Sequence, residues 1–538
     1  MKIAVVGSGV SGLAATWVSS AKISLDLHLN AVELQLLNEY SDHEVHLYEA
    51  DSRTGGHANT VRFTPPGKRP EEGVDVDTTY PNFLRFLKLH PEVPILKTEM
   101  TFSVSRDNGL FEWAGDNLFT IFIQPQRLLD PNHWRLIYDV LRFNACARRL
   151  VVGWSLEKDG SSGFGPLSIG EYLKKEGYSA SFRDNYLIPM TAAIWSTPPD
   201  KCAMDFPART LIQFLSNHHL LQITGKPSWL TIGGGSRRYV DAILSRVPAS
   251  RIHTSTAVSS LISTEGNKVL LTTAAGGLEV FDHVVLATHS DTTLSILKAG
   301  GGVTPLEEDV LKGFKWSRNR AVLHSDSGPG LMPRRRGAWS CWNYMTRSEA
   351  GKANVDQVAL TYGMNDLQHI SEEKYGPVLV TLNPPVEPAP EKTAGAWEYA
   401  HPVLDAEAIR SQKALSDIQN TRGITYAGAW TRYGFHEDGF TSGLAAVLTH
   451  ARTSIPGIRA PFNIEYVDRE PGQVVVARFF DWFEGGGWRT VVGAWMGVVL
   501  ATLRLLLGCL QLADFSQIEG EIEREQQRKV IEGKKKSA

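Results

Sequence analysis

Cysteine is scarce in this chain, and the few thiols present lie far apart. Cys146, Cys202, Cys341 and Cys509 form no CxxC pair and no cluster with histidine. This spacing excludes a recognisable zinc site and a disulfide framework, so we expect no bound metal. Such sparse cysteine usage is typical of a reducing compartment.

A strong charge of either sign is also missing. The chain has 55 Lys and Arg against 58 Asp and Glu, a formal net charge of -3. No global field attracts nucleic acid, so we expect no nucleic-acid partner. The N-terminus lacks the basic segment, apolar stretch and cleavage site of a secretory signal, so we expect the catalytic body to face the cytosol. A length of 538 residues exceeds one ordinary core and predicts at least two domains.

What is present, almost at the first residue, is a glycine-rich motif. The opening KIAVV indicates a buried strand, and GSGVSG followed by LAATW indicates a tight turn entering a helix. Gly7 permits the turn, Gly9 lets the backbone approach a diphosphate, and Gly12 lets helix and strand pack closely. Ser8 and Ser11 belong to the same turn, where the helix N-terminus offers free N-H groups to an anion. The motif predicts a dinucleotide site.

A second segment supports that prediction. EVHLYEAD indicates a strand ending at Glu49, whose carboxylate can accept hydrogen bonds from a ribose. Arg53 follows, and a guanidinium there can bind phosphate in bidentate fashion. Gly55 and Gly56 then let another backbone loop pass close to the cofactor, and His57 comes directly after them.

With these two segments the sequence resembles the flavin-containing amine oxidase superfamily, which binds FAD. ITYAGAWTRYGFHEDGFTSGLAAVLTHA, residues 424–451, is similar to the closing motif of that superfamily. The resemblance implies FAD contacts at Gly428, Asp438, Gly439 and Phe440, and a backbone contact to adenine at Val258. It narrows to a branch of amine-oxidase-like flavoproteins through TYPNF, AAIWSTPP, GGGSRRYV and GFHEDGFTSGL. Relatives in that branch encoded beside cyclopropane-fatty-acid synthases imply, by analogy, lipid modification.

The chain departs from the superfamily pattern in two places. Gly12 and Glu49 are 37 residues apart, whereas about 20 is usual, so we interpret residues 18–35 as an insertion. The second departure is a shortened segment after Asp77, where VDVDTTYPNF lacks the glycine-containing stretch expected near the flavin. The shorter loop puts oxidase chemistry in doubt and leaves the phosphate site intact.

The predicted fold is α/β. It has a Rossmann-type FAD-binding domain interleaved with a mixed-sheet and helical substrate or cap domain, and it ends in a hydrophobic helical appendage. The expected segments are 1–80, 231–295 and 421–455 for FAD binding, 81–230 for a helical cap, 296–420 for a substrate sheet, and 456–538 for the appendage.

The candidate catalytic residues are His436, beside the predicted flavin ring, His57 and Tyr344. The arginines of PRRRGAW, at 334–336, could attract an anionic head group, although a solvated basic turn is the more common explanation of such a run. We expect FAD-dependent dehydrogenation of an apolar, lipid-like substrate. The alternatives are an amine oxidase, a carotenoid-type desaturase, and an FAD-binding protein with impaired or no catalysis.

The C-terminal appendage contains VVGAWMGVVLATLRLLLGCL, residues 491–510, an apolar run with one arginine. A bilayer span needs about 20 apolar residues, and the central arginine opposes crossing, so a span, a monotopic anchor and a buried helix all remain open. The terminal KKSA resembles a dilysine retrieval signal of the endoplasmic reticulum. We therefore expect a membrane-associated protein with a cytosolic catalytic body, or else a cytoplasmic one.

Overall fold

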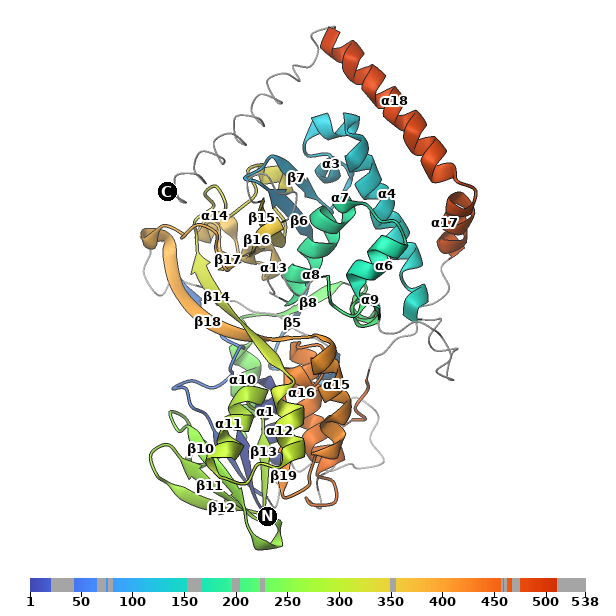
Figure 1. The fold of residues 1–538 in the computed structure, drawn as a ribbon. Coiled ribbons are helices and arrows are strands. Elements are labelled where there is room, and N and C mark those ends of the chain that lie inside the picture. Colours follow the sequence, from blue (N-terminus) through green and yellow to red (C-terminus); the bar gives the residue numbers. More distant parts are fainter. Residues whose placement is uncertain are drawn as a thin grey trace, which may run out of the picture. The chain divides into compact units, whose positions relative to one another are not determined.

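A computed structural model describes most of the chain. The described residues are 1–20, 43–64, 74–75, 81–151, 167–195, 204–222, 228–348, 355–455, 458, 462–466 and 475–509. They belong to two compact units (Figure 1). Unit 1 comprises Met1–Thr98, Trp229–Arg318 and Tyr399–Tyr466, and unit 2 comprises Glu99–Ser228, Asn319–Glu398 and Val467–Ala538.

Unit 1 is built on a parallel five-stranded sheet in the order β19-β13-β1-β2-β9. Its strands are β1 Lys2–Val6, β2 Glu44–Tyr48, β9 Ile252–His253, β13 His283–Leu286 and β19 Ile424–Tyr426. The order places β1 centrally, so the turn that follows β1 lies at the carboxyl edge between β2 and β13. Ligands of open parallel sheets bind at this edge.

The sheet of unit 1 separates two apolar cores, because successive strand residues face opposite sides. Ile3 and Val5 face a core formed with α1 Val10–Ser20, α2 Pro81–Lys88, α10 Arg237–Leu244 and α16 His436–Ala445. Ala4 and Val6 face the other core. It is formed with the antiparallel sheet of β10 Val258–Ser263, β11 Val269–Thr273 and β12 Leu278–Phe281, and with helices α11 Ser290–Ala299, α12 Pro305–Lys312 and α15 Ala406–Ala414. The sheet is therefore covered on both faces, as its unbroken apolar strands require.

The remaining elements of unit 1 are connections and edges. They are β3 Arg62–Phe63, β4 Val74–Asp75, β5 Ile95–Thr98, β8 Trp229–Ile232, η4 Ala249–Arg251, β10 Val258–Ser263, η5 Glu265–Asn267, β11 Val269–Thr273, β12 Leu278–Phe281, α11 Ser290–Ala299, α12 Pro305–Lys312, α15 Ala406–Ala414, η8 Leu415–Asp417, η9 Ala429–Thr431 and η10 Ala446–His450.

Unit 2 contains most of a mixed seven-stranded sheet in the order β18-β14-β17-β16-β15-β6-β7. The strands are β6 Phe102–Arg106, β7 Phe111–Ala114, β14 Lys315–His324, β15 Trp342–Ser348, β16 Val355–Gly363, β17 Leu379–Leu382 and β18 Thr393–Val403. β6 and β15 pair in parallel, whereas the pairs β6-β7, β15-β16, β16-β17 and β14-β17 are antiparallel. The chain passes between the units within β14 and again within β18.

The helices of unit 2 come mainly before and after this sheet in the sequence. They are α3 Leu118–Ile121, η2 Pro125–Leu129, α4 Pro131–Cys146, α6 Ile169–Lys175, α7 Ala180–Phe182, η3 Arg183–Leu187, α8 Ile188–Trp195, α9 Ala208–Asn217, η6 Arg336–Ala338, α13 Met364–Leu367, α14 Glu372–Tyr375, η7 Pro390–Lys392, α17 Val475–Gly485 and α18 Trp488–Cys509. Figure 1 shows α17 and α18 on the same side of unit 2 as α4.

The observed units differ from the expected segments at several boundaries. Residues 81–98 belong to unit 1, because Phe83 and Phe86 of α2 pack into the core beside α1 and α16. Residues 99–114 contain strands β6 and β7, which join the large sheet, so the expected helical cap is only partly helical. The substrate sheet begins at β14, so residues 296–314 belong to unit 1.

Three sequence interpretations lie largely or wholly outside the described residues. Of the interpreted insertion at 18–35, only the end of α1 at residues 18–20 is described. The shortened segment after Asp77 and the terminal KKSA lie entirely outside.

Candidate cofactor site

The glycine turn after β1 is closely packed at two of its three glycines. Gly7 has a φ of 97°, and a side chain there would begin 2.9 Å from the carbonyl oxygen of Ala287. A Cβ on Gly12 would lie 1.8 Å from the carbonyl oxygen of Gly7. At Gly9, by contrast, nothing lies within 4 Å of the position that a Cβ would take. The turn is thus open only where the motif predicts the approach of a diphosphate.

The helix that follows this turn brings its N-terminus to the same place. α1 begins at Val10, and Ser8 and Ser11 of the turn are buried. The first N-H groups of any α-helix lack partners within the helix, and they carry the positive end of its dipole. This end of α1 therefore suits an anionic group.

Glu49 lies at the end of the neighbouring strand and faces the glycine turn. Its Oε2 accepts a hydrogen bond of 2.9 Å from the backbone N-H of Ser8 and another from the Ser8 hydroxyl. Its Oε1 accepts one of 2.9 Å from the N-H of Asp51. The carboxylate therefore keeps a fixed position beside the turn and retains lone pairs for a further donor.

The segment after Glu49 packs directly onto the glycine turn. The N-H of Gly55 donates to the carbonyl oxygen of Ser8 at 3.1 Å. A Cβ on Gly56, which has a φ of 56°, would lie 3.0 Å from the Cα of Gly9. Arg53 donates through Nη2 to the carbonyl oxygen of Gly56 at 2.8 Å. The two glycine segments, far apart in the sequence, therefore form one surface.

The closing motif reaches the same surface through α16. A Cβ on Gly439 would meet Cγ1 of Val10 at 2.5 Å, and one on Gly443 would meet the carbonyl oxygen of Ser11 at 2.0 Å. The N-H of Gly428 donates to the hydroxyl of Ser442 at 2.9 Å, which ties the turn after β19 to α16. Glycines thus allow the first turns of α1 and α16 to lie in contact.

Two acidic residues open α16 and are held by backbone N-H groups. Asp438 accepts a hydrogen bond of 3.0 Å from the N-H of Phe435, and burial raises its pKa to about 7. Glu437 accepts from the N-H groups of Asn82 and Phe83 at 2.6 and 3.0 Å, and burial raises its pKa too. Burial therefore disfavours the ionised form of both carboxyl groups, and the backbone N-H donors offset part of that effect.

The two other residues implied by the resemblance have different surroundings. Val258 starts β10, two residues after Thr256, whose N-H donates to the Glu49 carbonyl at 2.8 Å. Val258 is therefore adjacent to the strand that carries Glu49. The Phe440 side chain is fully buried among Trp17, Phe83 and Phe86, so only its backbone is left to contact a ligand.

A cluster of histidines borders this surface through His57. The His57 ring lies 5.8 Å from that of His289, 5.5 Å from that of His401 and 4.9 Å from that of Tyr399. His57 is an exposed residue on the surface of the protein. Desolvation by the protein atoms around it nevertheless lowers its pKa to about 3, and repulsion from His401 and His289 adds to this effect. Burial lowers the pKa of His401 to about 4 and that of His289 as well. The cluster is therefore uncharged near neutral pH.

The sequence interpretation included His57 and missed its two partners. His289 follows β13 at the carboxyl edge of the sheet, and its ring stacks on Trp316 at 3.8 Å. Its position after an apolar strand was a usable signal. His401 lies in β18, far along the chain, and nothing local in the sequence connects it to His57.

His436 begins α16 and packs among aromatic rings in unit 1. Its ring centroid lies 4.9 Å from that of Phe83 and 5.4 Å from that of Tyr239. Its Nε2 is buried with no hydrogen-bond partner in the described part of the chain, and burial lowers its pKa to about 4. An unpartnered buried nitrogen next to the converging helices marks a place for a polar ligand atom.

Tyr344 lies in unit 2, on β15, where its side chain is fully buried. Its hydroxyl has no hydrogen-bond partner among the described residues, and burial raises its pKa well above the ordinary value. The arginines of PRRRGAW are also in unit 2 and are partly neutralised there. Arg335 pairs with buried Glu112 at 3.1 Å, and Arg336 pairs with Glu372. These pairs favour a structural basic turn over a head-group site.

No group of three or more metal-ligating side chains occurs among the residues that the structure describes. The same part of the chain has one helical segment long and apolar enough to cross a membrane, Trp488–Leu507, of which 6% is buried.

Comparison with known proteins places the chain in a family. A family model described as flavin containing amine oxidoreductase matches residues 31–309. No curated protein sequence matches.

Several solved structures share the fold. Cyclohexylamine oxidase from Brevibacterium oxydans has a TM-score of 0.54 and 13% identity, covering 84% of this chain and 99% of that one. A conjugated-linoleic-acid-producing fatty acid isomerase from P. acnes has a TM-score of 0.51 and 13% identity, with coverage of 83% and 97%. A triple mutant of putrescine oxidase has a TM-score of 0.51 and 14% identity, with coverage of 84% and 99%.

Proposed function

The chain belongs to the flavin containing amine oxidoreductase family and is an FAD-dependent oxidoreductase, and from this premise we propose that it dehydrogenates an apolar, lipid-like substrate at a membrane surface. The observation that carries the proposal is the meeting of three glycine segments at the N-termini of α1 and α16, beside a cluster of uncharged histidines.

In this proposal, the glycine turn and its neighbours hold FAD. Gly7, Gly9 and Gly12 shape the turn, and the N-terminus of α1 binds the diphosphate. Glu49 accepts hydrogen bonds from the ribose, and Arg53 with the Gly55-Gly56 pair borders the diphosphate. The turn from Gly428 to Gly439 lies against the second half of the cofactor. Bound FAD would supply a two-electron acceptor.

The side chains around the cofactor surface determine what else can bind there. His57, His289 and His401 are uncharged near neutral pH, and the rings of Tyr399 and Trp316 complete the cluster. Each neutral imidazole can donate one hydrogen bond and accept another, and the cluster carries no fixed charge. In the proposed reaction, His57 and His436 of unit 1 orient the substrate.

Two observations support an apolar substrate. The rings that contact the His57 ring, those of His289, His401 and Tyr399, carry no negative charge, whereas a protonated amine would need a carboxylate as a partner. One structure of similar fold is a fatty acid isomerase, and the apolar helix α18 would keep the enzyme near lipids. At 13% identity the fatty acid isomerase shares the fold, so its substrate is a guide to the class of compound to be tested.

The second candidate function is amine oxidation, which the family description and the cyclohexylamine oxidase fold favour. Aromatic rings such as those of Tyr399 and Trp316 could hold the alkyl part of such a substrate. The two candidates therefore differ in the compounds that reduce the flavin.

Anaerobic reduction of the bound flavin tests both candidates. The holoprotein would be mixed under argon with fatty acids, with phospholipids or with primary and secondary amines, and the oxidised flavin absorbance would be followed. Bleaching by a lipid fraction supports the proposal, and bleaching by amines alone replaces it with the second candidate. A protein that holds FAD and is reduced by dithionite, but by none of these compounds, contradicts both.

A further inference from the structure

We propose that unit 2 binds a bilayer surface through a membrane face formed by α3, η2, α4, α17 and α18, and that α3 is a second insertion point. The inference rests on the proposed membrane location of the enzyme. It adds that α18 lies along the bilayer, and that Leu118 and Phe119, remote from α18 in the sequence, enter the lipid with it.

The surface of α18 is apolar and largely exposed. This 22-residue helix is apolar on nearly all sides, and its described charged residues are Arg489 and Arg504. Of its described side chains, only Leu500 is buried, whereas Trp495 and Leu505 are 68% and 69% exposed. A helix that is apolar all round belongs in a protein core or in lipid. Since unit 2 covers one narrow stripe, lipid is the remaining environment.

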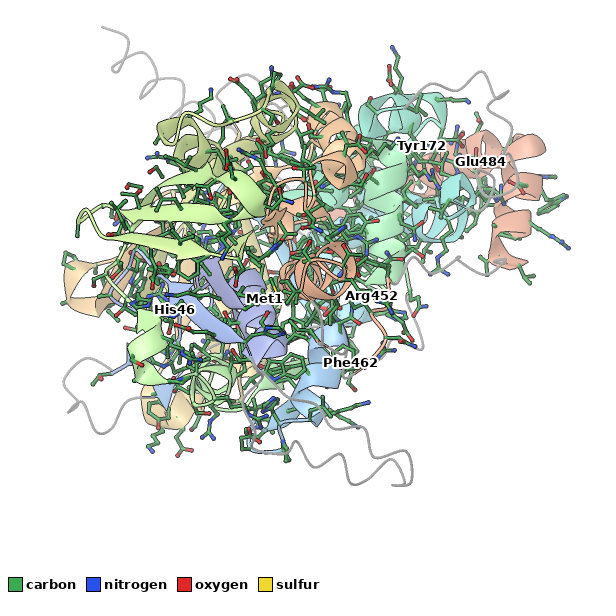
Figure 2. All side chains as sticks on the ribbon, turned by 90° about the horizontal axis from the view of Figure 1, so that it is seen from below. Met1, His46, Tyr172, Arg452, Phe462 and Glu484 are labelled. Atoms are coloured by element: carbon green, nitrogen blue, oxygen red, sulfur yellow. The ribbon has the colours of Figure 1, made fainter. Side chains whose placement is uncertain are left out.

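α17, which immediately precedes α18, is tied to α4 and to the segment that follows α4. The Tyr138 hydroxyl of α4 donates to Glu484 at 2.6 Å, and Arg149, three residues beyond the end of α4, pairs with Asp481 in bidentate fashion at 2.6 and 2.8 Å. α18 then continues in contact with α4 and η2. Figure 1 shows the two helices beside α4, and Figure 2 labels Glu484 at this junction. A helix held along the folded unit lies on a bilayer and does not cross it.

The tip of α3 presents two large apolar side chains to solvent. Phe119 is 88% exposed and Leu118 is 74% exposed. The tip is held by a capping box, in which Asn117 accepts from the N-H groups of Phe119 and Thr120 at 2.9 and 3.1 Å. The Thr120 hydroxyl also donates to the Ala114 carbonyl at 3.1 Å. The exposed pair is therefore displayed by a fixed turn.

The tip and α18 belong to one surface. Three residues separate α3 from η2, and η2 contacts α18. Exposed leucines on η2 and α4, at Leu128 and Leu141, continue the apolar area. Most large apolar side chains that are exposed in the described chain belong to these five elements. Contiguous exposure on this scale marks an interaction site.

Two features favour lipid over a protein partner as the occupant. Exposed tryptophans, at 482, 488 and 495, follow one another along α17 and α18, and tryptophan is enriched where protein meets the bilayer interface. Helices α4, α17 and α18 together carry five arginines and three acidic residues. This positive excess suits anionic lipid head groups.

Flotation with vesicles tests the inference without involving catalysis. The FAD-loaded full-length protein would be mixed with phosphatidylcholine vesicles, with or without phosphatidylglycerol, and its bound fraction measured on a density gradient. The variants are Leu118→Ser/Phe119→Ser in α3 and Trp495→Ser/Leu505→Ser in α18. The matched control is Leu278→Ser/Val280→Ser, which removes an exposed apolar pair from β12 of unit 1. Flavin absorbance checks that every variant is folded.

The α3 pair and the α18 pair should each reduce the vesicle partition coefficient at least about tenfold, because each removes two large apolar side chains from lipid. The β12 control should bind like the wild type, and phosphatidylglycerol should strengthen binding of all. If the α3 variant binds vesicles like the wild type and the α18 variant does not, the inference is overturned. The membrane anchor of the proposed function then stays intact. If neither the α3 pair nor the α18 pair weakens vesicle binding, the face is overturned. If the wild type does not bind vesicles, or self-associates instead, both the face and the membrane location are overturned.

Discussion

Replacing Gly9 by alanine should separate cofactor binding from folding. No heavy atom of the protein lies within 4 Å of the Cβ that this substitution adds, and Gly9 is not among the residues with positive φ. The free energy of unfolding of the apoprotein should therefore change by less than about 0.5 kcal/mol. The added methyl group occupies the open side of the turn, where the diphosphate is proposed to bind.

The expected effect on affinity follows from crowding. Forcing one methyl group into a well-packed contact costs about 1–3 kcal/mol, which corresponds to FAD binding that is weaker by about 5- to 150-fold. Gly12→Ala is the matched comparison, because its Cβ would lie 1.8 Å from the carbonyl oxygen of Gly7. α1 would have to move away from the turn, so this variant should lose both stability and FAD affinity.

Two measurements check this pair of variants. Apoprotein prepared with chaotropic salt would be titrated with FAD while flavin fluorescence is followed, and thermal unfolding of each apoprotein would be recorded. Gly12→Ala should unfold several degrees below the wild type, at roughly 2–4 °C per kcal/mol. The reasoning is refuted if Gly9→Ala binds FAD as tightly as the wild type, or if it unfolds as early as Gly12→Ala.

Three further predictions concern side chains. In the protein, the two carboxylate oxygens of Glu49 accept three hydrogen bonds, and Glu49→Gln leaves only one oxygen to accept them. FAD titration of this variant should therefore show roughly tenfold weaker binding. An unchanged FAD affinity would contradict the role of Glu49. The pKa of Asp438 is raised to about 7, so the folded state holds a proton that the unfolded state releases above about pH 4, and stability is lost as pH rises toward 7. Asp438→Asn should therefore gain apoprotein stability relative to the wild type between about pH 4 and 7, by up to a few kcal/mol, and a melting-temperature difference independent of pH would refute this. The pKa of His57 is lowered to about 3, so kcat/KM should show no inflection from this residue between about pH 5 and 8, whereas an inflection near 6.5 that His57→Gln removes would contradict the neutral cluster.

Local patterns were sufficient to find the parts of the cofactor surface. GSGVSG predicted a strand, a tight turn and a helix, and the structure has β1, a turn with positive φ at Gly7, and α1. Glu49 and the Gly55-Gly56 pair were recognised from their position after the next strand. These features depend on neighbours in the sequence and on backbone conformations that glycine favours, so they can be predicted without knowledge of the tertiary structure.

Other features required contacts between distant residues. His289 and His401 come to His57 from β13 and β18, which are far apart in the chain, and no local pattern relates them. Strands β6 and β7 lie between segments with helical patterns, and their pairing with β15 identifies them. The exposed pair in α3, Leu118 and Phe119, did not indicate a membrane face by itself, since a single exposed leucine or phenylalanine is ordinary on a protein surface.

The sequence by itself determined that a dinucleotide turn opens the chain, that FAD is the cofactor, and that an apolar helix lies near the end. Each of these depends on short-range chemistry: backbone freedom at glycine, a carboxylate at the end of a strand, and continuous hydrophobicity. Only the tertiary structure decided that α1 and α16 touch through glycines, that three histidines share one neutral cluster, and that α18 runs along α4. These outcomes depend on packing and desolvation, which arise only when residues distant in sequence exclude water from one another.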